Sequence, residues 1–371
     1  MKQILVLHIS ECGGHKRASE NIKEALQSID PHIRVLNING FGQIYPWAER
    51  FINYLYTTTI KYLPQLWGKV YDKKPIIKAL EPLKRSINML GFRKFSKLVK
   101  GFNPHAIVAT QAFPCGLACD FKSYFNAQFS IFAVVTDYHP HRFWIHPKID
   151  NYIVPCKDSE NTLIGEGVDK EKIKIFGIPI SVKFLEACTR IDIASKYGFN
   201  PDLDSILVMG GGSGFGPIKD IVLKLDNLDC RFQVIVVCGT NKRLLHWFKK
   251  KAHKFKRPIF YFGYIDFVNI LMDFADIIIT KPGGITVSEA LSKGLAIIVV
   301  NPIPGQEERN VNYLEEKNVI LKTNSTKEIG YLVKGLLTNK DELIFLRQRS
   351  KSISQKDSSL KIADFILKSL S

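Results

Sequence analysis

The sequence predicts an α/β protein with two doubly wound parallel sheets, and three observations support this prediction. Short β-branched runs recur along the 371 residues, and most are continuously apolar, as in strands buried on both faces of a parallel sheet. Amphipathic helical segments lie between many of these runs, for example around Ala18, Ile22 and Leu26. The length suits two domains, and the runs form two sets, before about residue 180 and from about residue 205.

The expected strands follow from these runs in chain order. They are 4–9, 106–110, 131–136 and 152–154 in the first set, and 206–209, 233–238, 259–262, 276–280 and 296–300 in the second. We predict a first domain over 1–182 and a second over 183–353, facing one another across a cleft. The segment 354–371 is expected to form a terminal helix, for which packing on the first domain is one option.

Composition limits the cellular compartment and the binding partners that we expect for this protein. No stretch approaches the roughly 18 apolar residues of a membrane span, and the first apolar run follows Met1 too closely for a signal peptide. The seven cysteines contain no CxxC pair, which favours a reducing cytoplasm over disulfides or a metal site. The formal charge of +17 predicts an anionic partner, either nucleic acid or an acidic membrane surface.

The stretch 41–100 departs from the strand pattern. It holds twelve Lys and Arg against three Asp and Glu, a net charge of +9, together with eleven aromatic residues. Such basic, aromatic helices bind at a bilayer interface, and the alternative is a packed insertion with a solvated basic face. No RNP, KH or zinc motif accompanies it, so nucleic acid is disfavoured. The residues expected to meet the membrane are Trp47, Trp67, Lys73, Lys74, Lys84 and Arg85.

A Gly-containing turn follows the first expected strand and precedes a helix, in SECGGHKRAS (10–19). Such a turn presents backbone N–H groups and the positive helix end to a ligand. His15 lies at the helix start, where these dipoles disfavour the imidazolium and favour a neutral ring that accepts a proton. Glu11 could orient that ring or act as the base itself, so the assignment stays open. Gly14 is expected beside the acceptor. The alternative is a capped turn with an exposed histidine.

A second glycine-rich turn, MGGGSGFG (209–216), follows a strand of the second domain. It permits the close backbone approach that a diphosphate requires, although a tight strand–helix turn would have the same composition. It matches neither the ATP-binding nor the NAD-binding glycine motif.

The stretch TKPGGITVSEALSKGLAIIVVNPIPGQEERNVNYL (280–314) carries the most specific pattern. Gly283 and Gly284 open a helix whose N–H groups can hold a phosphate, and Thr286 adds a hydroxyl. Glu289 follows one turn later, where its carboxylate could bind two ribose hydroxyls. Gln306 and Glu307 follow the next strand and suit the hydroxyls of a hexose.

A carboxylate and three histidines cluster at Asp137, His139, His141 and His146. The spacing is not that of two ligands on one helix face, so we favour a cleft-lining role toward the acceptor or between the domains over a metal site, with plain packing as the alternative. No metal is predicted.

These motifs together resemble glycosyltransferase family 28. The 280–314 stretch is similar to the donor-binding signature of that family. TDYHPHRFWIHPKIDNYIVP (136–155), GIPI (177–180) and GGHKRAS resemble its branch of monogalactosyldiacylglycerol synthases and processive diacylglycerol glucosyltransferases. The resemblance implies a GT-B fold with an N-terminal acceptor domain and a C-terminal UDP-sugar domain.

The resemblance also implies residue roles. It makes Gly284, Ile285 and Thr286 phosphate contacts, Glu289 the ribose ligand, and Gln306 and Glu307 the hexose ligands. It makes the backbone at Phe262, Gly263 and Tyr264 the uracil reader, and places Gly212 and Gly214 in the loop that faces donor and acceptor. The family turn commonly has Gly where this chain has Cys12, which again leaves the base open between His15 and Glu11.

The resulting expectation is an inverting, metal-independent transfer of a hexose from UDP-galactose or UDP-glucose to diacylglycerol. UDP-hexose is the substrate, and no cofactor is expected. The protein would act peripherally at the cytoplasmic face of a membrane. The alternatives are an acceptor with a polyprenyl-linked sugar, and a catalytically silent lipid-sensing protein.

Overall fold

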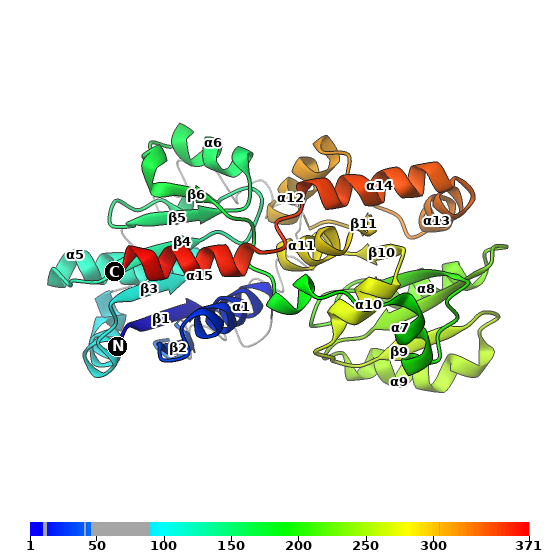
Figure 1. Cartoon of the computed structure of the whole chain (residues 1–371), viewed down its shortest axis with the longest axis horizontal. Coiled ribbons are helices and arrows are strands. Elements are labelled where there is room, and N and C mark those ends of the chain that lie inside the picture. The colour runs from blue at the N-terminus through cyan, green and yellow to red at the C-terminus, as the bar shows by residue number, and fades with distance from the viewer. Residues whose placement is uncertain (10–12, 41, 46–88, 304, 371) are drawn as a thin grey trace. The chain divides into compact units, whose positions relative to one another are not determined.

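The computed structural model describes residues 1–9, 13–40, 42–45, 89–303 and 305–370. The chain divides into two compact units, and each is described by itself. The first unit comprises 1–182, 303–309 and 357–371, and the second comprises 183–302 and 310–356. The segment 303–309 thus groups with the first unit, whereas the sequence assigned it to the second domain. Both units are α/β, as predicted (Figure 1).

The described part of the first unit contains a six-stranded parallel sheet in the order β2-β1-β3-β4-β5-β6. Its strands are β1 Gln3–His8, β2 Arg34–Asn39, β3 Ala106–Ala109, β4 Ser130–Val134, β5 Asn151–Val154 and β6 Ile173–Ile175. Its helices are α1 Gly14–Ile29, α5 Ala112–Phe125, α6 Lys157–Gly165, α15 Ser358–Ser369 and the helix at 89–102, with short 3-10 turns at Arg142–Trp144 and Lys170–Lys172. Because helices cover both faces, the central strands are apolar throughout.

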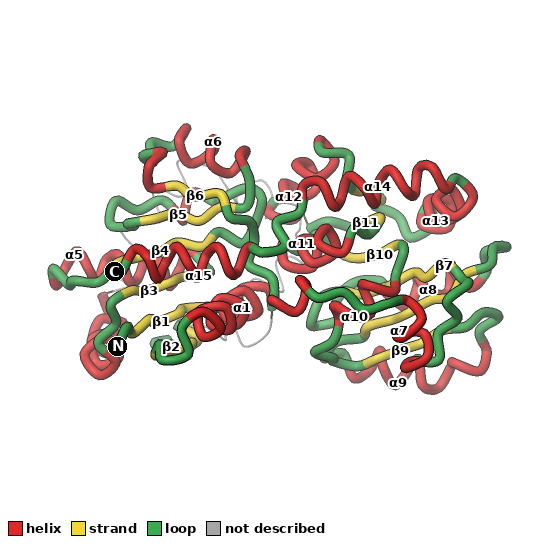
Figure 2. Tube along the Cα trace, in the orientation of Figure 1, coloured by secondary structure: helices red, strands yellow, loops and turns green. Residues whose placement is uncertain are grey.

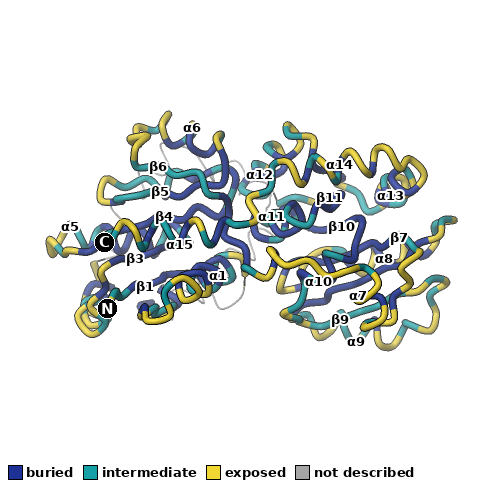
Figure 3. The backbone as a smooth tube through the Cα atoms, in the orientation of Figure 1, coloured by how far each residue is buried: buried dark blue, intermediate teal, exposed yellow. Residues whose placement is uncertain are grey.

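Alternate residues of β1 point into two separate cores. Ile4 and Val6 join the core that α1 and α15 cover, and Leu5 and Leu7 join the core beneath α5 and the 89–102 helix. All four side chains are fully buried, which stabilises the fold by about 1.5–3 kcal/mol for each. Figure 3 shows the buried strands in dark blue.

The last helix returns to the first unit. Helix α15 packs beside α1 (Figure 1). Ser358 donates its hydroxyl hydrogen to the Ile178 carbonyl at 2.8 Å, and Ser359 donates to the Ile180 carbonyl at 2.5 Å. Lys2 donates to the Leu367 carbonyl at 2.7 Å. These contacts complete the core on that face of the first sheet.

The second unit holds a six-stranded parallel sheet within its described residues, in the order β12-β11-β10-β7-β8-β9. Its strands are β7 Asp204–Met209, β8 Phe232–Val237, β9 Ile259–Phe262, β10 Ile277–Thr280, β11 Ala296–Val300 and β12 Ile320–Thr323 (Figure 2). Its helices are α7 Arg190–Tyr197, α8 Ile218–Asp226, α9 Lys242–Lys251, α10 Val268–Phe274, α11 Gly284–Lys293, α12 Gln306–Glu316, α13 Ile329–Thr338 and α14 Lys340–Ile353. Short 3-10 turns lie at Val182–Leu185 and Ala252–Lys254. Residues 306–309 of α12 group with the first unit.

The strand orders locate the binding edges. In the first sheet the chain runs from β1 to β2 on one side and then returns to β3 on the other side of β1. In the second sheet it runs from β7 to β9 and then returns to β10 on the other side of β7. Ligands of open α/β sheets bind at the carboxyl ends of the strands where the order reverses. The loops after β1 and β3, and those after β7 and β10, are therefore the candidate site loops.

Within the described ranges, no helix is both long enough and apolar enough to cross a bilayer.

Candidate active site

His15 lies at the reversal point of the first sheet. Gly13 precedes α1 with φ 130°, a conformation that favours glycine, and no side chain caps the helix start. The His15 ring reaches the residues that follow β3 and β4. Its Nδ1 lies 2.9 Å from the Thr110 carbonyl oxygen and 3.0 Å from the Thr136 hydroxyl. Since a carbonyl oxygen only accepts hydrogen bonds, Nδ1 carries the proton and Nε2 keeps its lone pair.

The ring is held in place and kept neutral. The Thr110 hydroxyl donates to the His15 carbonyl at 2.9 Å, which ties the start of α1 to the end of β3. Burial lowers the pKa of His15, and the nearby Asp137 carboxylate and the Thr110 carbonyl oppose that shift. The imidazole is therefore neutral near pH 7 and can accept a proton at Nε2.

Asp137 and Gln306 meet within the first unit. The Gln306 side-chain amide donates to the Asp137 carboxylate. The adjacent Glu307 carboxylate accepts from the Ile303 backbone N–H at 3.1 Å. One residue predicted to bind the hexose thus lies beside the carboxylate that faces His15. The other, Glu307, holds the turn that leads into α12.

The histidines after Asp137 do not converge on one point. His141 is buried and its Nδ1 accepts from the Phe143 N–H at 3.1 Å, which caps the 3-10 turn there. His146 Nε2 lies 3.2 Å from Asp120 instead. His139 is half-buried. Among the described residues, no group of three or more His, Cys, Asp or Glu side chains could hold a metal ion.

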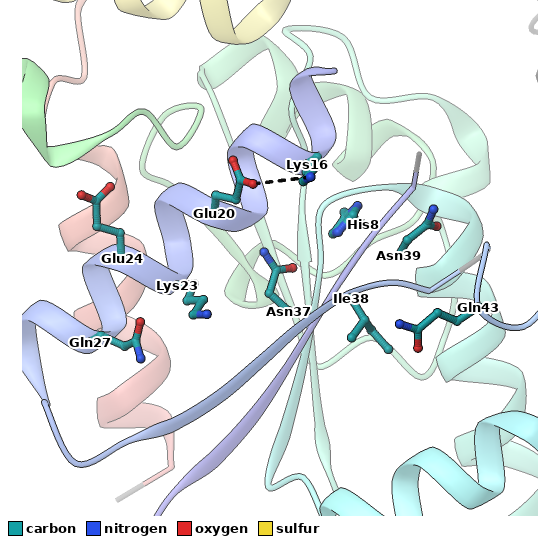
Figure 4. Close-up of a pocket in the computed structure, with 10 residues that line it drawn as sticks. All are labelled: His8, Lys16, Glu20, Lys23, Glu24, Gln27, Asn37, Ile38, Asn39 and Gln43. Atoms are coloured by element: carbon teal, nitrogen blue, oxygen red, sulfur yellow. Dashed lines mark ion pairs between the residues drawn. The ribbon is translucent and has the colours of Figure 1, made fainter. Parts of the chain in front are cut away.

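A polar cavity of about 490 Å³ lies between α1 and β2 (Figure 4). Lys16 and Glu20 form an ion pair on its α1 side at 3.9 Å. The Asn37 Oδ1 atom is buried and has no hydrogen-bond partner in the part of the chain that the structure describes. The lining residues are His8, Lys16, Glu20, Lys23, Glu24, Gln27, Asn37, Ile38, Asn39 and Gln43. None is a predicted site residue, because nothing in the sequence pattern brings α1 and β2 together.

The backbone conformation of the glycine-rich turn after β7 requires glycine. Gly214 has φ 60°, and a Cβ atom there would collide with the Cys238 carbonyl after β8. Gly212 is exposed, and its carbonyl accepts from the Thr240 N–H at 2.9 Å. The backbone of this turn therefore packs against the loop after β8, at the reversal point of the second sheet.

The loop after β10 leads into a helix start without a side-chain cap. Gly283 precedes α11, and its carbonyl accepts from the Val287 N–H at 3.0 Å. Gly284 and Ile285 are buried, and Thr286 is half-buried. The N–H groups of the first turn and the positive end of the helix dipole can therefore hold an anion. This is the arrangement predicted for the donor phosphate.

Two further residues at this edge did not enter the sequence prediction. Thr280 ends β10, and its buried hydroxyl has no hydrogen-bond partner among the described residues. The Cε atom of Lys281 lies 3.6 Å from the point where a Cβ atom on Gly211 would stand, so its side chain lies beside the glycine-rich turn. A lysine beside the two loops that were predicted to hold a diphosphate adds a positive charge to this edge of the sheet. The sequence signal that could have identified them is a Thr–Lys pair at the carboxyl end of a buried strand.

Glu289 is buried, with 4% of its surface exposed, on the second turn of α11. The predicted uracil turn follows edge strand β9. There the Phe262 carbonyl accepts from the Cys238 N–H at 2.8 Å, and Tyr264 is 63% exposed. The Phe262 carbonyl is thus engaged in a hydrogen bond to the residue after the neighbouring strand. Of the three predicted uracil contacts, the backbone of Gly263 and Tyr264 lies beyond this bond.

Several predicted residues lie outside the described residues. They are Glu11, Trp47, Trp67, Lys73, Lys74, Lys84 and Arg85. Gly14 is described and exposed as the first residue of α1.

Solved structures with the same architecture define the class. A MurG crystal structure from Acinetobacter baumannii superposes with a TM-score of 0.65 at 14% identity, covering 99% of this chain and 100% of that one. The S. aureus MnaA-UDP co-structure superposes with a TM-score of 0.67 at 16% identity, covering 100% and 97%. The fold is therefore GT-B, as the resemblance implied.

Sequence relatives define the family. Residues 15–180 match the family described as monogalactosyldiacylglycerol (MGDG) synthase, and 205–364 match the glycosyltransferase family 28 C-terminal domain. A processive diacylglycerol beta-glucosyltransferase from Staphylococcus epidermidis is 30% identical over 92% of this chain and 86% of the relative. One from Bacillus subtilis (strain 168) is 28% identical over 99% and 95%. The chain belongs to the glycosyltransferase family 28 branch of MGDG synthases and processive diacylglycerol glucosyltransferases, which confirms the resemblance.

Proposed function

We propose that the protein transfers a hexose from a UDP-sugar to the primary hydroxyl of diacylglycerol and forms a β-glycosyl diacylglycerol. One observation carries the proposal. The two halves of the chain match, in order, the MGDG synthase family and the family 28 C-terminal domain, and the diacylglycerol glucosyltransferases match 92–99% of its length. The uncapped start of α11 and the neutral His15 supply the two chemical functions that such a transfer needs.

His15 is the base in this proposal. The lipid hydroxyl attacks the anomeric carbon, its oxygen forms the new glycosidic bond, and its proton passes to His15 Nε2. The fixed Nδ1–H···O=C bond to Thr110 holds the ring in the tautomer that this step needs. The Asp137 charge stabilises the imidazolium that results. Positioned base catalysis contributes about 10²–10⁴-fold.

The departing UDP receives its stabilisation from the second unit. The bond between the anomeric carbon and the phosphate oxygen breaks as the acceptor attacks, and charge develops on the diphosphate. The first turn of α11, the backbone of the 210–216 turn and Lys281 then act as preorganised positive groups. The proposed step uses no metal and no cofactor.

We propose glucose as the transferred hexose, because the similar relatives over the whole chain are named glucosyltransferases. The test presents the purified protein with diacylglycerol vesicles and either UDP-glucose or UDP-galactose, with excess EDTA in parallel. We expect a glycosyl lipid from UDP-glucose at an undiminished rate in EDTA. A faster reaction with UDP-galactose would overturn the sugar assignment, and strict dependence on added Mg²⁺ would overturn the metal-free step.

The same assay separates the alternatives. A polyprenyl-linked sugar acceptor in place of diacylglycerol should give no product. The absence of any glycosyl lipid would leave the silent lipid-sensing protein as the better interpretation.

An anionic membrane at the cytoplasmic face is the proposed partner of the first unit. The described end of the basic insertion supports this assignment. The helix at 89–102 exposes Met89 and Leu90, the latter to 78%, close to the exposed cations Arg93, Lys94 and Lys97. Exposed aliphatic groups beside cations suit the headgroup boundary of an acidic bilayer.

Replacing Lys73, Lys74, Lys84 and Arg85 by Glu is expected to abolish binding to anionic vesicles and to leave UDP affinity unchanged, because the change reverses four charges of the insertion. Vesicle sedimentation and calorimetry measure the two quantities. The matched control places Glu at four exposed lysines of the second unit, Lys196, Lys327, Lys334 and Lys356. Unchanged vesicle binding in the first variant would make the insertion an ordinary solvated face.

A further inference from the structure

The second unit carries a basic surface that the donor site does not use. The segment 242–257 reads KRLLHWFKKKAHKFKR and contains eight Lys and Arg and no Asp or Glu. It forms α9 and the 3-10 turn Ala252–Lys254. We define the basic surface by its six exposed cations, Lys242, Arg243, Lys249, Lys250, Lys254 and Lys256.

The cations of α9 lie together on one face. At about 100° per residue, Lys242, Arg243, Lys249 and Lys250 fall within an arc of about 120°. The opposite face is apolar and lies in the core, with Phe248 fully buried and Leu244, Leu245 and Trp247 packed against it. Lys219 of the adjacent α8 lies 4.9 Å above the Trp247 ring and extends the surface.

Local helix stability does not explain this pattern. Lys242 and Arg243 occupy the first turn of α9, where the helix dipole favours acidic residues. In the part of the chain that the structure describes, no carboxylate pairs with any of the six cations, and Asp226 is engaged by Arg257. The exposed acids nearest in sequence on α8 and its following loop are Asp220 and Asp229. Like charges held together without an acidic partner favour an anionic ligand.

We propose that this basic surface binds the anionic face of a lipid bilayer. The cations lie on the outer face of a helix rather than in a groove. Of the aromatic residues in 242–257, Trp247, Phe248 and Phe255, none is exposed, so the base-stacking platform that single-stranded nucleic acid uses is missing there. The choice of a bilayer over a nucleic acid rests also on the proposed lipid acceptor. Because the apolar face of α9 is buried, the attraction is electrostatic and does not involve insertion.

The test replaces Lys242, Arg243, Lys249 and Lys250 by Gln in the full chain. Sedimentation measures partition into phosphatidylcholine vesicles with and without phosphatidylglycerol. Each cation near an acidic surface contributes roughly fivefold, so the anionic vesicles should bind the variant at least tenfold more weakly. The matched control is Gln at Lys196, Lys327, Lys334 and Lys356, which removes the same charge elsewhere in the unit and should bind like the wild type.

The contribution of the basic surface should also vanish at high salt. The Debye length falls from about 10 Å at 0.1 M salt to about 3 Å at 1 M. The difference between wild type and the Gln variant is therefore expected to close at 1 M salt. Equal binding of both proteins at low salt, an equal loss in the control, or tighter binding of the wild type to a single-stranded RNA than to anionic vesicles would overturn the proposal.

Transfer activity in neutral detergent micelles separates this inference from the proposed function. Both Gln variants should react at the wild-type rate there, which also shows that they fold. If no form transfers a hexose in micelles, the proposed function fails, and the vesicle partition still tests the basic surface.

Discussion

Replacing His15 by Ala is expected to lower the turnover number by about 10²–10⁴-fold and to leave UDP affinity unchanged. The reason is the geometry of the ring. Nδ1 donates to the Thr110 carbonyl, burial lowers the pKa of the ring, and Nε2 is the atom left to take the proton of the acceptor. Steady-state kinetics with diacylglycerol and calorimetry with UDP measure the two quantities.

The matched control is His32→Ala, since His32 is an exposed histidine of the same unit. It should leave turnover unchanged. Near-normal turnover in the His15 variant would remove it as the base. Glu11→Gln would then be the next variant to measure.

The pH profile gives a second readout of the same residue. Because burial lowers the pKa of His15, the basic form prevails at neutral pH, and kcat/KM should fall only as the pH drops below the ordinary range of a histidine. This acidic limb should be absent from the residual activity of His15→Ala. A limb that persists in the variant would belong to another group.

Replacing Glu289 by Gln is expected to weaken UDP binding by roughly 10–100-fold while kcat at saturating donor changes little. The carboxylate is buried on α11 beside the proposed phosphate site, where it can accept two hydrogen bonds from vicinal hydroxyls. One hydrogen bond to a charged group contributes about 1.5–3 kcal/mol, and the loss of one such bond sets this range. Calorimetric titration with UDP measures the change.

A second ligand tests the assigned contact. Wild type should bind 2′-deoxy-UDP more weakly than UDP. Glu289→Gln should bind the two equally, because the variant lacks the carboxylate that the 2′-hydroxyl would contact. Glu308→Gln, an exposed carboxylate on α12, is the control and should retain the preference. A preference for UDP that survives in the Glu289 variant would contradict the ribose assignment.

The strands that the sequence revealed are those with a continuously apolar run, and these include every central strand and the edge strand β9. All nine predicted runs are strands, and the three that escaped notice, β2, β6 and β12, are edge strands. An edge strand is partly exposed, so its residues need not be continuously apolar. β2 reads RVLNIN and has only its last two residues buried. Its pattern therefore differs from the one that identifies a central strand.

In the candidate site, features set by neighbouring residues were predictable from the sequence, and contacts between distant segments were not. The turn and helix starts at His15 and at Gly283 were predictable, because strand, glycine and helix lie within a few residues of each other. The contacts of His15 with Thr110 and Thr136 were not, since they depend on which strands become neighbours. The cap that His141 forms on its own turn was not predicted either, although its partner Phe143 lies only two residues away.

The configuration of the product tests the central claim most directly. Purified protein is incubated with UDP-glucose and diacylglycerol vesicles, and the lipid product is examined by proton NMR for its anomeric coupling. A single displacement by the lipid hydroxyl predicts one product series whose first sugar is β-linked to the glycerol hydroxyl. An α-linked product, or glucose released without a glycolipid, would contradict direct transfer assisted by His15.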